Sequence, residues 1–345
     1  MKYMKKSLTE KIENILTREI MHGVYPPGGV FPSEFDSVRR FGVSRVTVRR
    51  VYANLEQKGI LRRKIRCNTI VNERLTAATD PIRMLGAVLP VEHEFSRVFL
   101  YSLNQEAVRE KALIVLAPPF SDSVSQSNVA IDLVCGGVRN LVVWGYDQNI
   151  DLETFRRLRL LGINIVFFDH VMPGKIADYV CLDNEHAIRL LFDKALVNGA
   201  RRFVFVNTGG LEVETSKERE YFFVKLCQER NLPYSIVALS WREMLVNGAE
   251  KQCREFFQNL PDMAECAIFC ANAFQAECIH HAVDGKGQYY SISTREHKYA
   301  SNIYNIVQPI FEMAKQCFEC LRMQQNEGSR WKAKEYRKKG TPDWQ

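Results

Sequence analysis

Short apolar runs alternate with amphipathic helical segments through the middle of the chain. The helical segments include 97–110 and 185–197, and the apolar runs are Leu85–Leu89, Leu113–Ala117, Leu141–Trp144, Ile163–Phe168 and Phe203–Val206. Apolar runs of this length, joined by helices, are typical of a parallel sheet with helices on both faces. Such sheets bind ligands beyond the carboxyl ends of their strands. The sequence therefore predicts an α/β body with a small-molecule site.

A different pattern precedes this body. The apolar residues within 8–22 have helical spacing, and we expect this helix to end at Gly23. Ser33 is placed to cap a second helix that runs to Phe41. Gly42 breaks that helix, and Ser44 can cap a third, Arg-rich one. Two short helices joined by a tight turn form the helix-turn-helix pattern, whose second helix enters the major groove of DNA.

The third helix and the segment after it carry the candidate DNA contacts. Arginine can donate two hydrogen bonds to guanine, and hydroxyl groups can bind phosphates. Residues near the start of this helix are best placed for bases or flanking phosphates, whereas Val46, Val48 and Val51 include its inward face. Residues 60–66 and 69–71 read as two short strands, a wing along the DNA backbone. The candidate contacts are Ser33, Ser44, Arg45, Thr47, Arg49, Arg50, Arg62, Arg63 and Arg66.

The charge distribution supports this interpretation. Residues 1–72 carry 15 Lys and Arg against 6 Asp and Glu, and residues 329–345 have a net charge of +4, whereas the whole chain has only +7. The middle of the chain is therefore acidic, and the basic head is suited to a polyanion. The alternative is a basic, solvated helical surface without a partner.

The head resembles the DNA-binding domain of the GntR family over residues 8–71. The resemblance rests on the order of turn, cap and contact residues, which includes Pro32-Ser33-Glu34, Gly42-Val43-Ser44-Arg45 and Thr47-Val48-Arg49. It implies a winged helix-turn-helix. Phe35 stands where the family has a basic residue, and Arg66-Cys67-Asn68 stands where the wing has a Gly-x-Gly, so the operator sequence does not transfer.

The body resembles the effector domain of the LacI/GalR family, which has the two-lobed fold of periplasmic sugar-binding proteins, over residues 84–325. The matching pieces include Gly86–Pro90, Gly162–Asp169, Val180–Asn184, Asn198–Val206 and Ile306–Pro309. A GntR-type head on a LacI-type body is similar to the arabinose-repressor type of regulator. The fold expected is thus α/β, with a winged helix-turn-helix followed by a two-lobed domain of parallel sheets.

This second resemblance implies a set of ligand-binding residues. They are Phe95 or Ser96, Asp169, Arg219, Asn272 and Gln308. Planar Arg, Asn and Asp groups can pair two sugar hydroxyls each, and an aromatic ring can cover a sugar face. Structural alternatives remain: Asp169 could cap the next segment, and Asn272 could hold a strand end. Trp144 and Trp241 are expected in the core or on the rim, with stacking on a ligand as the alternative.

Two departures bear on the ligand. The family's Asn-Asp pair is Asn272-Ala273 here, and no carboxylate occurs in Ser291–Thr294, where an Asp commonly binds sugar hydroxyls. A different or modified ligand is therefore compatible with the sequence. The tail at 329–345 could hold the family's last strand around Tyr336–Thr341 or be a disordered basic end, and we favour disorder.

Other classes of protein find little support in the sequence. No apolar run approaches the roughly 20 residues of a membrane helix, and the amino terminus lacks the apolar centre of a signal peptide, so we expect a cytoplasmic protein. Zinc or redox chemistry could be imagined at the Cys317-x-x-Cys320 pair, or at Cys266 and Cys270, which are four residues apart. Cys317 and Cys320 fall in a stretch of helical period, however, where cysteines usually pack in the apolar core. Nucleotide-binding and hydrolase motifs are missing, so we expect no enzyme, no cofactor and no metal.

Together these features predict a DNA-binding domain at 1–72, a linker at 73–83, a ligand-sensing domain at 84–325 and a basic tail at 326–345. We expect a homodimer that binds a double-stranded operator, represses carbohydrate-related genes and responds to a small molecule, most simply a sugar. The alternative is a constitutive DNA binder whose sensor has lost sugar binding or senses another metabolite.

Overall fold

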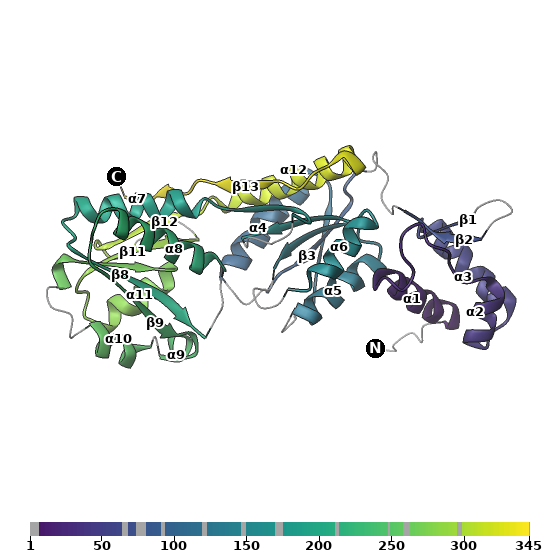
Figure 1. Ribbon diagram of the computed structural model, residues 1–345, viewed down its shortest axis with the longest axis horizontal. Coiled ribbons are helices and arrows are strands. Elements are labelled where there is room, and N and C mark those ends of the chain that lie inside the picture. Colours follow the sequence, from purple (N-terminus) through teal and green to yellow (C-terminus); the bar gives the residue numbers. More distant parts are fainter. Residues whose placement is uncertain are drawn as a thin grey trace.

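The computed structural model describes residues 7–63, 68–73, 81–90, 94–118, 123–145, 150–169, 175–210, 214–247, 249–257, 263–294 and 299–344. These residues form a small head and two larger lobes that follow one another along the long axis of the molecule (Figure 1). None of the helices in these ranges is long and apolar enough to cross a membrane.

The head has the three helices and the two-stranded wing that the sequence predicts. Its elements are α1 (Leu8–Met21), α2 (Glu34–Phe41), α3 (Arg45–Gln57), β1 (Leu61–Arg63) and β2 (Thr69–Val71). The two strands pair antiparallel. Gly42 ends α2 with a φ of 63°, a left-handed conformation that glycine adopts without steric cost.

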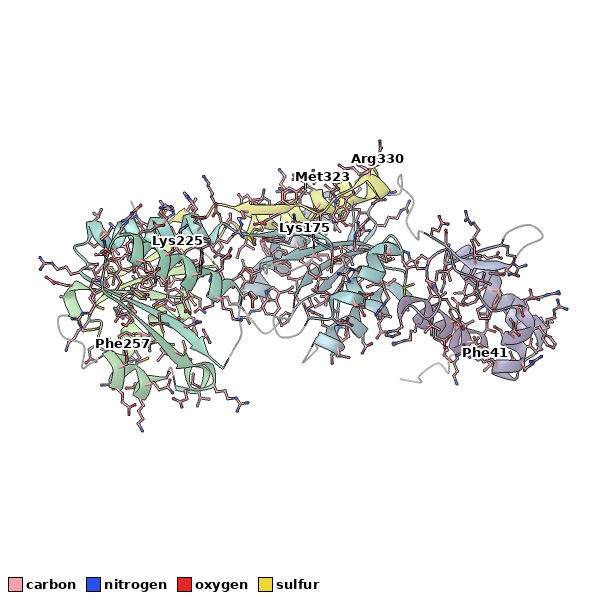
Figure 2. All side chains as sticks on the ribbon, viewed as in Figure 1. Phe41, Lys175, Lys225, Phe257, Met323 and Arg330 are labelled. Atoms are coloured by element: carbon pink, nitrogen blue, oxygen red, sulfur yellow. The ribbon has the colours of Figure 1, made fainter. Side chains whose placement is uncertain are left out.

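The amino-terminal lobe is a parallel sheet covered on both faces. Its strands, in spatial order, are β13 (Glu335–Lys338), β7 (Asp178–Leu182), β6 (Asn164–Phe168), β5 (Asn140–Trp144), β3 (Met84–Val88) and β4 (Leu113–Leu116). Alternate residues of β6 pack on opposite faces: Ile165 and Phe167 on one, Val166 and Phe168 on the other. The helices are α4 (Glu94–Arg109), α5 (Ser123–Cys135), α6 (Leu152–Leu160) and α12 (Ile310–Glu327), which carries Met323 along this lobe (Figure 2).

The carboxy-terminal lobe repeats this plan. Its strands, in spatial order, are β14 (Thr341–Pro342), β12 (Ile303–Val307), β11 (Gln288–Ser293), β10 (Cys266–Cys270), β8 (Arg202–Gly209) and β9 (Tyr234–Ser240). All neighbours are parallel except β14, which runs antiparallel to β12. The helices are α7 (Asn184–Val197), α8 (Glu214–Glu229), α9 (Trp241–Asn247), α10 (Glu250–Phe257) and α11 (Ala273–Ala282), with a short 3₁₀ turn at Met263–Glu265.

The chain crosses between the lobes three times. It leaves β7 for α7 at Asp183, leaves β12 for α12 at residues 308–309, and leaves β13 for β14 at residues 339–340. At the last crossing only glycine fits, because a Cβ on Gly340 would lie 2.8 Å from the Val307 carbonyl oxygen. The two lobes are thus joined by short segments, the arrangement from which hinge motion arises.

The carboxy-terminal residues are ordered strands and not a disordered tail. Glu335–Lys338 pairs in parallel with β7, and residues 341–342 pair with β12, so the preference for disorder is wrong and the alternative of a strand in this region is correct. The physical reason is that both segments complete the edge of a sheet. A basic composition did not prevent pairing, because the bonds are made by the backbone.

The head packs directly on the amino-terminal lobe. Helix α1 lies against α5 and α6 (Figure 1). The head's apolar core is continuous with the core of that lobe. Arg18 of α1 forms an ion pair with Asp132 of α5. Gly23, which follows α1, lies so close to Arg157 of α6 that a Cβ would come within 2.7 Å of the arginine Cδ.

The described cysteines behave as packing residues. Cys317 and Cys320 are buried in α12, and burial raises the pKa of Cys317 well above its usual range and that of Cys320 to about 12. None of the nine cysteines in the described part of the chain forms a disulfide, and His, Cys, Asp and Glu in this part form no group of three suited to a metal ion. The prediction that the C-x-x-C pair packs in a helix is confirmed.

Candidate DNA interface and ligand site

Two serine caps fix the start of the helices that would meet DNA. The hydroxyl of Ser33 accepts a hydrogen bond from the amide of Asp36, and the hydroxyl of Ser44 accepts one from the amide of Thr47, each at 3.2 Å. Each cap satisfies an amide at a helix amino terminus, where the remaining N–H groups favour an anion. The predicted caps at Ser33 and Ser44 are confirmed, whereas DNA contact by these side chains stays a prediction.

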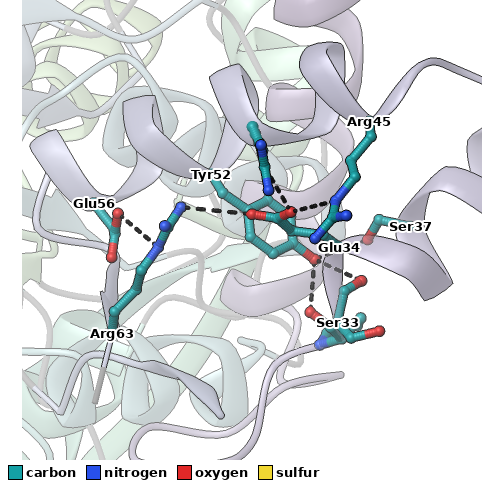
Figure 3. A network of polar contacts seen from close by, with 9 residues as sticks. Ser33, Glu34, Ser37, Arg45, Tyr52, Glu56 and Arg63 are labelled. Atoms are coloured by element: carbon teal, nitrogen blue, oxygen red, sulfur yellow. Dashed lines mark hydrogen bonds and ion pairs between the residues drawn. The ribbon is translucent and has the colours of Figure 1, made fainter. Parts of the chain in front are cut away.

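A buried tyrosine holds α2 against α3. The hydroxyl of Tyr52 donates to the carbonyl oxygen of Pro32 at 2.7 Å and lies 2.8 Å from the hydroxyl of Ser37 (Figure 3). Burial raises the pKa of Tyr52 to about 12, so the hydroxyl remains a donor at neutral pH. The position of α3 relative to the start of α2 is therefore fixed from inside the head.

Three arginines of the outer face converge on one carboxylate. Glu34 accepts hydrogen bonds from Nε of Arg45 at 3.1 Å and Nε of Arg49 at 3.0 Å, and Nη2 of Arg63 lies 3.9 Å away (Figure 3). Partial burial acts to raise the pKa of Glu34, but the bonds from Arg49 and Arg45 outweigh it, so the pKa is lowered from its usual value. Glu34 is thus ionised and gathers the arginines of α3 and the wing.

The structure brings most of the predicted DNA contacts to one surface. The arginines of α3 and β1 are all exposed, and Arg63 also pairs with Glu56 at 3.1 Å. Arg66 lies outside the described residues. The side chains on this surface are Arg45, Arg49, Arg50, Arg62 and Arg63. Their contact with DNA stays a prediction.

Sequence reasoning misplaced Val46 and did not single out the contact between Phe35 and Arg39. Val48 and Val51 are buried as expected, but Val46 is 76% exposed and so is not on the inward face. The guanidinium of Arg39 lies over the exposed ring of Phe35, 4.9 Å from its centroid. The spacing of four residues between Phe35 and Arg39 on a helix was the available signal.

The predicted ligand residues lie beyond the carboxyl ends of strands. Phe95 and Ser96 are in the first turn of α4 after β3, Asp169 follows β6, Asn272 follows β10, and Gln308 follows β12. Arg219 lies in α8 and donates from Nη1 to the carbonyl oxygen of Ala271, at the end of β10. These positions come from both lobes and include one of the crossing segments.

Two of these residues have buried polar atoms without a hydrogen-bond partner. Ser96 is 1% exposed and Gln308 is 7% exposed, and among the described residues nothing pairs with Ser96 Oγ or Gln308 Oε1. A buried polar atom left unpaired costs about 1–3 kcal/mol. Ser96 Oγ can therefore donate or accept a hydrogen bond, and Gln308 Oε1 can accept one, from a polar ligand or from water.

Arg219 is buried within a hydrogen-bonded network. Its Nε donates to Oδ1 of Asn184 at 2.8 Å, and Asn184 donates in turn to Glu218 at 2.6 Å. Burial lowers the pKa of Arg219, while the negative charges of Asp169 and Glu218 act in the opposite direction. Glu218 also pairs at 2.7 Å with Arg337 of β13, which connects α8 of one lobe to the sheet of the other. Sequence reasoning did not single out Asn184, Glu218 or Arg337.

The other candidates also have structural roles. Nε1 of Trp144 donates to Oδ2 of Asp169 at 3.2 Å, and Asp169 has a φ of 66°. Oδ1 of Asn272 accepts from the amide of Gln275 at 2.9 Å and so caps α11. Phe95 packs on Phe168, with ring centroids 6.1 Å apart. Ligand contact by these three candidates stays a prediction.

Comparison with known proteins agrees with this division of the chain. The model of the gntR family of bacterial regulatory proteins matches residues 8–71. Residues 8–71 are a helix-turn-helix domain of the gntR type. The histidine utilization repressor of Klebsiella aerogenes is 32% identical over 97 residues, which are 28% of this chain and 40% of that protein. The chain spans 24% and 40% of the length of two curated relatives that it matches.

Solved structures match the fold of the two lobes that follow the gntR-type domain. The trehalose repressor from Escherichia coli has a TM-score of 0.62 at 15% identity and covers 76% of this chain and 100% of its own. A LacI family regulator from Enterococcus faecium, solved with bound ribose, has a TM-score of 0.62 at 13% identity and covers 75% of this chain and 96% of its own. The predicted two-lobed fold of the LacI type is confirmed.

Proposed function

We propose that this chain is a ligand-responsive transcription regulator that represses carbohydrate-related genes. In this proposal the gntR-type head binds a double-stranded operator, and a sugar held between the lobes changes the affinity of the head for DNA. The observation that carries the proposal is the joining of a gntR-type domain to a two-lobed body of the LacI fold through direct packing of α1 on α5 and α6.

The head has the chemistry that sequence-specific DNA binding needs. Arg45 and Arg49 project from the first two turns of α3, where a helix in the major groove meets base edges. Arg62 and Arg63 lie on the wing, where they bind phosphates in this proposal. Ser44 caps α3 at the amide of Thr47, so the backbone positions from which Arg45 and Arg49 project are fixed.

The body has the chemistry that a polyhydroxylated ligand needs. Ser96 Oγ and Gln308 Oε1 are buried and unpartnered among the described residues. Arg219 uses Nε and Nη1 for protein acceptors, and a guanidinium has five N–H donors in all. We propose that Arg219, Ser96, Gln308, Asp169, Asn272 and Phe95 contact the ligand.

The dimer that such a regulator needs has a candidate surface. β4 is an edge strand, and Leu113 and Leu116 on it are 70% and 41% exposed. Tyr101 and Val108 of the adjacent α4 are each 67% exposed. Exposed apolar side chains along a sheet edge mark an interaction site. We propose that a second copy of the chain covers this face.

The neutral residues at Ala273, Ser293 and Thr294 support one alternative. These positions lack the carboxylates that usually bind sugar hydroxyls, so the body could sense another metabolite or have lost its ligand. The head would then bind DNA constitutively.

Ligand binding can be tested by thermal unfolding with a panel of pentoses, hexoses, trehalose and their phosphates, on the wild type and on Arg219→Ala. We expect at least one compound to raise the wild-type midpoint and to change operator affinity by about 5–150-fold, the range of a coupling of about 1–3 kcal/mol. Arg219→Ala should bind the operator as the wild type does without ligand, because Arg219 lies outside the head, but should lose the response. A compound that acts equally on both proteins would remove Arg219 from the site, and a panel without effect would favour the constitutive alternative.

A further inference from the structure

One exposed apolar side chain stands in the middle of the basic face of α3. The buried side of this helix consists of Val48, Val51, Tyr52 and Leu55. With about 100° between successive residues, Val46 points away from that side, and Arg49 and Arg50 flank it at spacings of three and four. The 76% exposure of Val46 agrees with this geometry.

The residues around Val46 place it on the surface that would meet DNA. Its neighbours Arg45 and Arg49 are drawn toward α2 by Glu34, with Nε–Oε2 distances of 3.1 and 3.0 Å. Both guanidinium groups are therefore held on one side, and the valine methyls are left between them and Arg50. In the described part of the head, the Val46 side chain is therefore largely uncovered.

The chemistry of the major groove supplies one apolar partner. Among the four bases only thymine presents a methyl group there, on C5, and side-chain methyls contact it. We propose that Val46 reads the C5-methyl group of a pyrimidine, thymine in unmodified DNA, and so sets part of the operator sequence. This inference rests on the proposed DNA-binding function.

The assignment explains why a valine is tolerated on a surface made for a polyanion. A valine adds nothing to phosphate binding, and burial of an apolar side chain against a methyl group excludes water from both. Because phosphates are the same for every sequence, Val46 contributes to specificity and not to the salt-dependent, sequence-independent part of the affinity.

The test replaces each thymine of a selected operator, one at a time, by deoxyuridine, which keeps the hydrogen-bonding groups and lacks the methyl. The wild type should lose about fourfold in affinity at one thymine in each half-site, the equivalent of about 0.8 kcal/mol for a buried methyl-sized group. Val46→Ala should bind the thymine and uracil operators equally. The matched control is Val197→Ala, because Val197 is 80% exposed on α7, far from the head in sequence, and it should discriminate like the wild type.

The outcomes separate this inference from the proposed function. Val46→Ala removes an exposed side chain and introduces the best helix former, so its fold and its binding to random DNA should be unchanged. The inference alone is overturned if the wild type binds its operator but no replacement of thymine by uracil lowers its affinity. It is also overturned if Val46→Ala loses as much affinity as the wild type does when the methyl group is removed. A wild type that binds no sequence in preference to another overturns the proposed function.

Discussion

Glu34 organises the basic surface that the arginines of α3 and β1 form on the head. It gathers Arg45, Arg49 and Arg63 around one carboxylate, and these arginine side chains are 50–68% exposed, whereas that of Glu34 is 21% exposed. Exposed ion pairs contribute only about 0–1 kcal/mol each to stability. They also limit the positions that the long arginine side chains occupy, which in the proposed function would reduce the entropy lost when the head binds DNA.

Arg45→Ala and Arg49→Ala should each reduce specific binding and leave the fold intact. A bidentate base contact contributes about 1–3 kcal/mol, which corresponds to a loss of roughly 5–150-fold in affinity for the operator. Arg62→Ala and Arg63→Ala should instead weaken binding to all sequences and lower its salt dependence.

Fluorescence anisotropy with operator and scrambled duplexes at several salt concentrations measures both effects. If Arg45→Ala and Arg49→Ala bound the operator as tightly as the wild type does, the assignment of α3 as the recognition helix would be wrong.

The helix caps and the left-handed turn of the head could be predicted from the sequence. The exposure of Val46 could not be predicted from its residue type. Ser33, Gly42 and Ser44 carry local signals, because a cap or a left-handed turn depends on a few neighbouring residues. Val46 and Val48 look alike in sequence, but only the period set by Val48, Val51 and Leu55 separates the buried side from the exposed one. The role of Glu34 depends on contacts between two helices and the wing, which no spacing rule gives.

At the scale of elements, β13 and β14 bind the end of the chain into both sheets. The residues Glu335–Lys338 have little apolar character, so their sequence did not favour a strand over a basic tail. They form a strand because β7, which is distant in sequence, provides backbone hydrogen-bond partners. Asp178 of β7 also accepts a hydrogen bond from the amide of Lys334, the residue before β13. This long-range dependence explains why the segment was misjudged.

Asp178→Asn should destabilise the amino-terminal lobe. Asp178 is fully buried and accepts from Nε2 of Gln324 at 2.8 Å, Nε1 of Trp331 at 3.1 Å and the amide of Lys334 at 2.8 Å. Asparagine has one acceptor oxygen and cannot serve all three donors, so we expect a loss of about 1–3 kcal/mol in the free energy of unfolding.

The pH dependence of this loss follows from the pKa of Asp178. Burial raises this pKa above its usual value even though the three hydrogen bonds act to lower it. The linked stability is therefore fully present below the unfolded pKa of about 3.9 and is lost as pH rises through the raised folded value.

In urea unfolding, the difference between the wild type and Asp178→Asn should grow as pH falls from neutrality. Asp193→Asn is the matched surface control, since Asp193 is half-exposed and pairs only with Arg230 among the described residues. A difference that does not change with pH would contradict the raised pKa.

For the whole molecule, the head sits on the lobe that carries the proposed dimer face, and the second lobe lies beyond it (Figure 1). If a ligand changes the angle between the lobes, the head moves together with the amino-terminal lobe, because α1 packs on α5 and α6 and Gly23 lies against Arg157 of α6. Such a ligand shifts the DNA-binding equilibrium only by its different affinity for the two arrangements. The ion pair of Glu218 and Arg337 joins the two lobes, so the distance between its partners would change with the angle between the lobes.

The most direct test of the account is selection of binding sites from a random pool of double-stranded DNA. The wild-type protein should enrich a two-fold symmetric sequence whose half-sites lie about 10–10.5 base pairs apart or a multiple of this, because two heads on a symmetric dimer meet the same groove face. Leu113→Lys, which places a charge on the proposed dimer face, should enrich a single half-site at lower affinity. A final pool with the composition of the starting pool, or one enriched equally by the double variant Arg45→Ala and Arg49→Ala, would contradict the claim that this protein reads DNA sequence through α3.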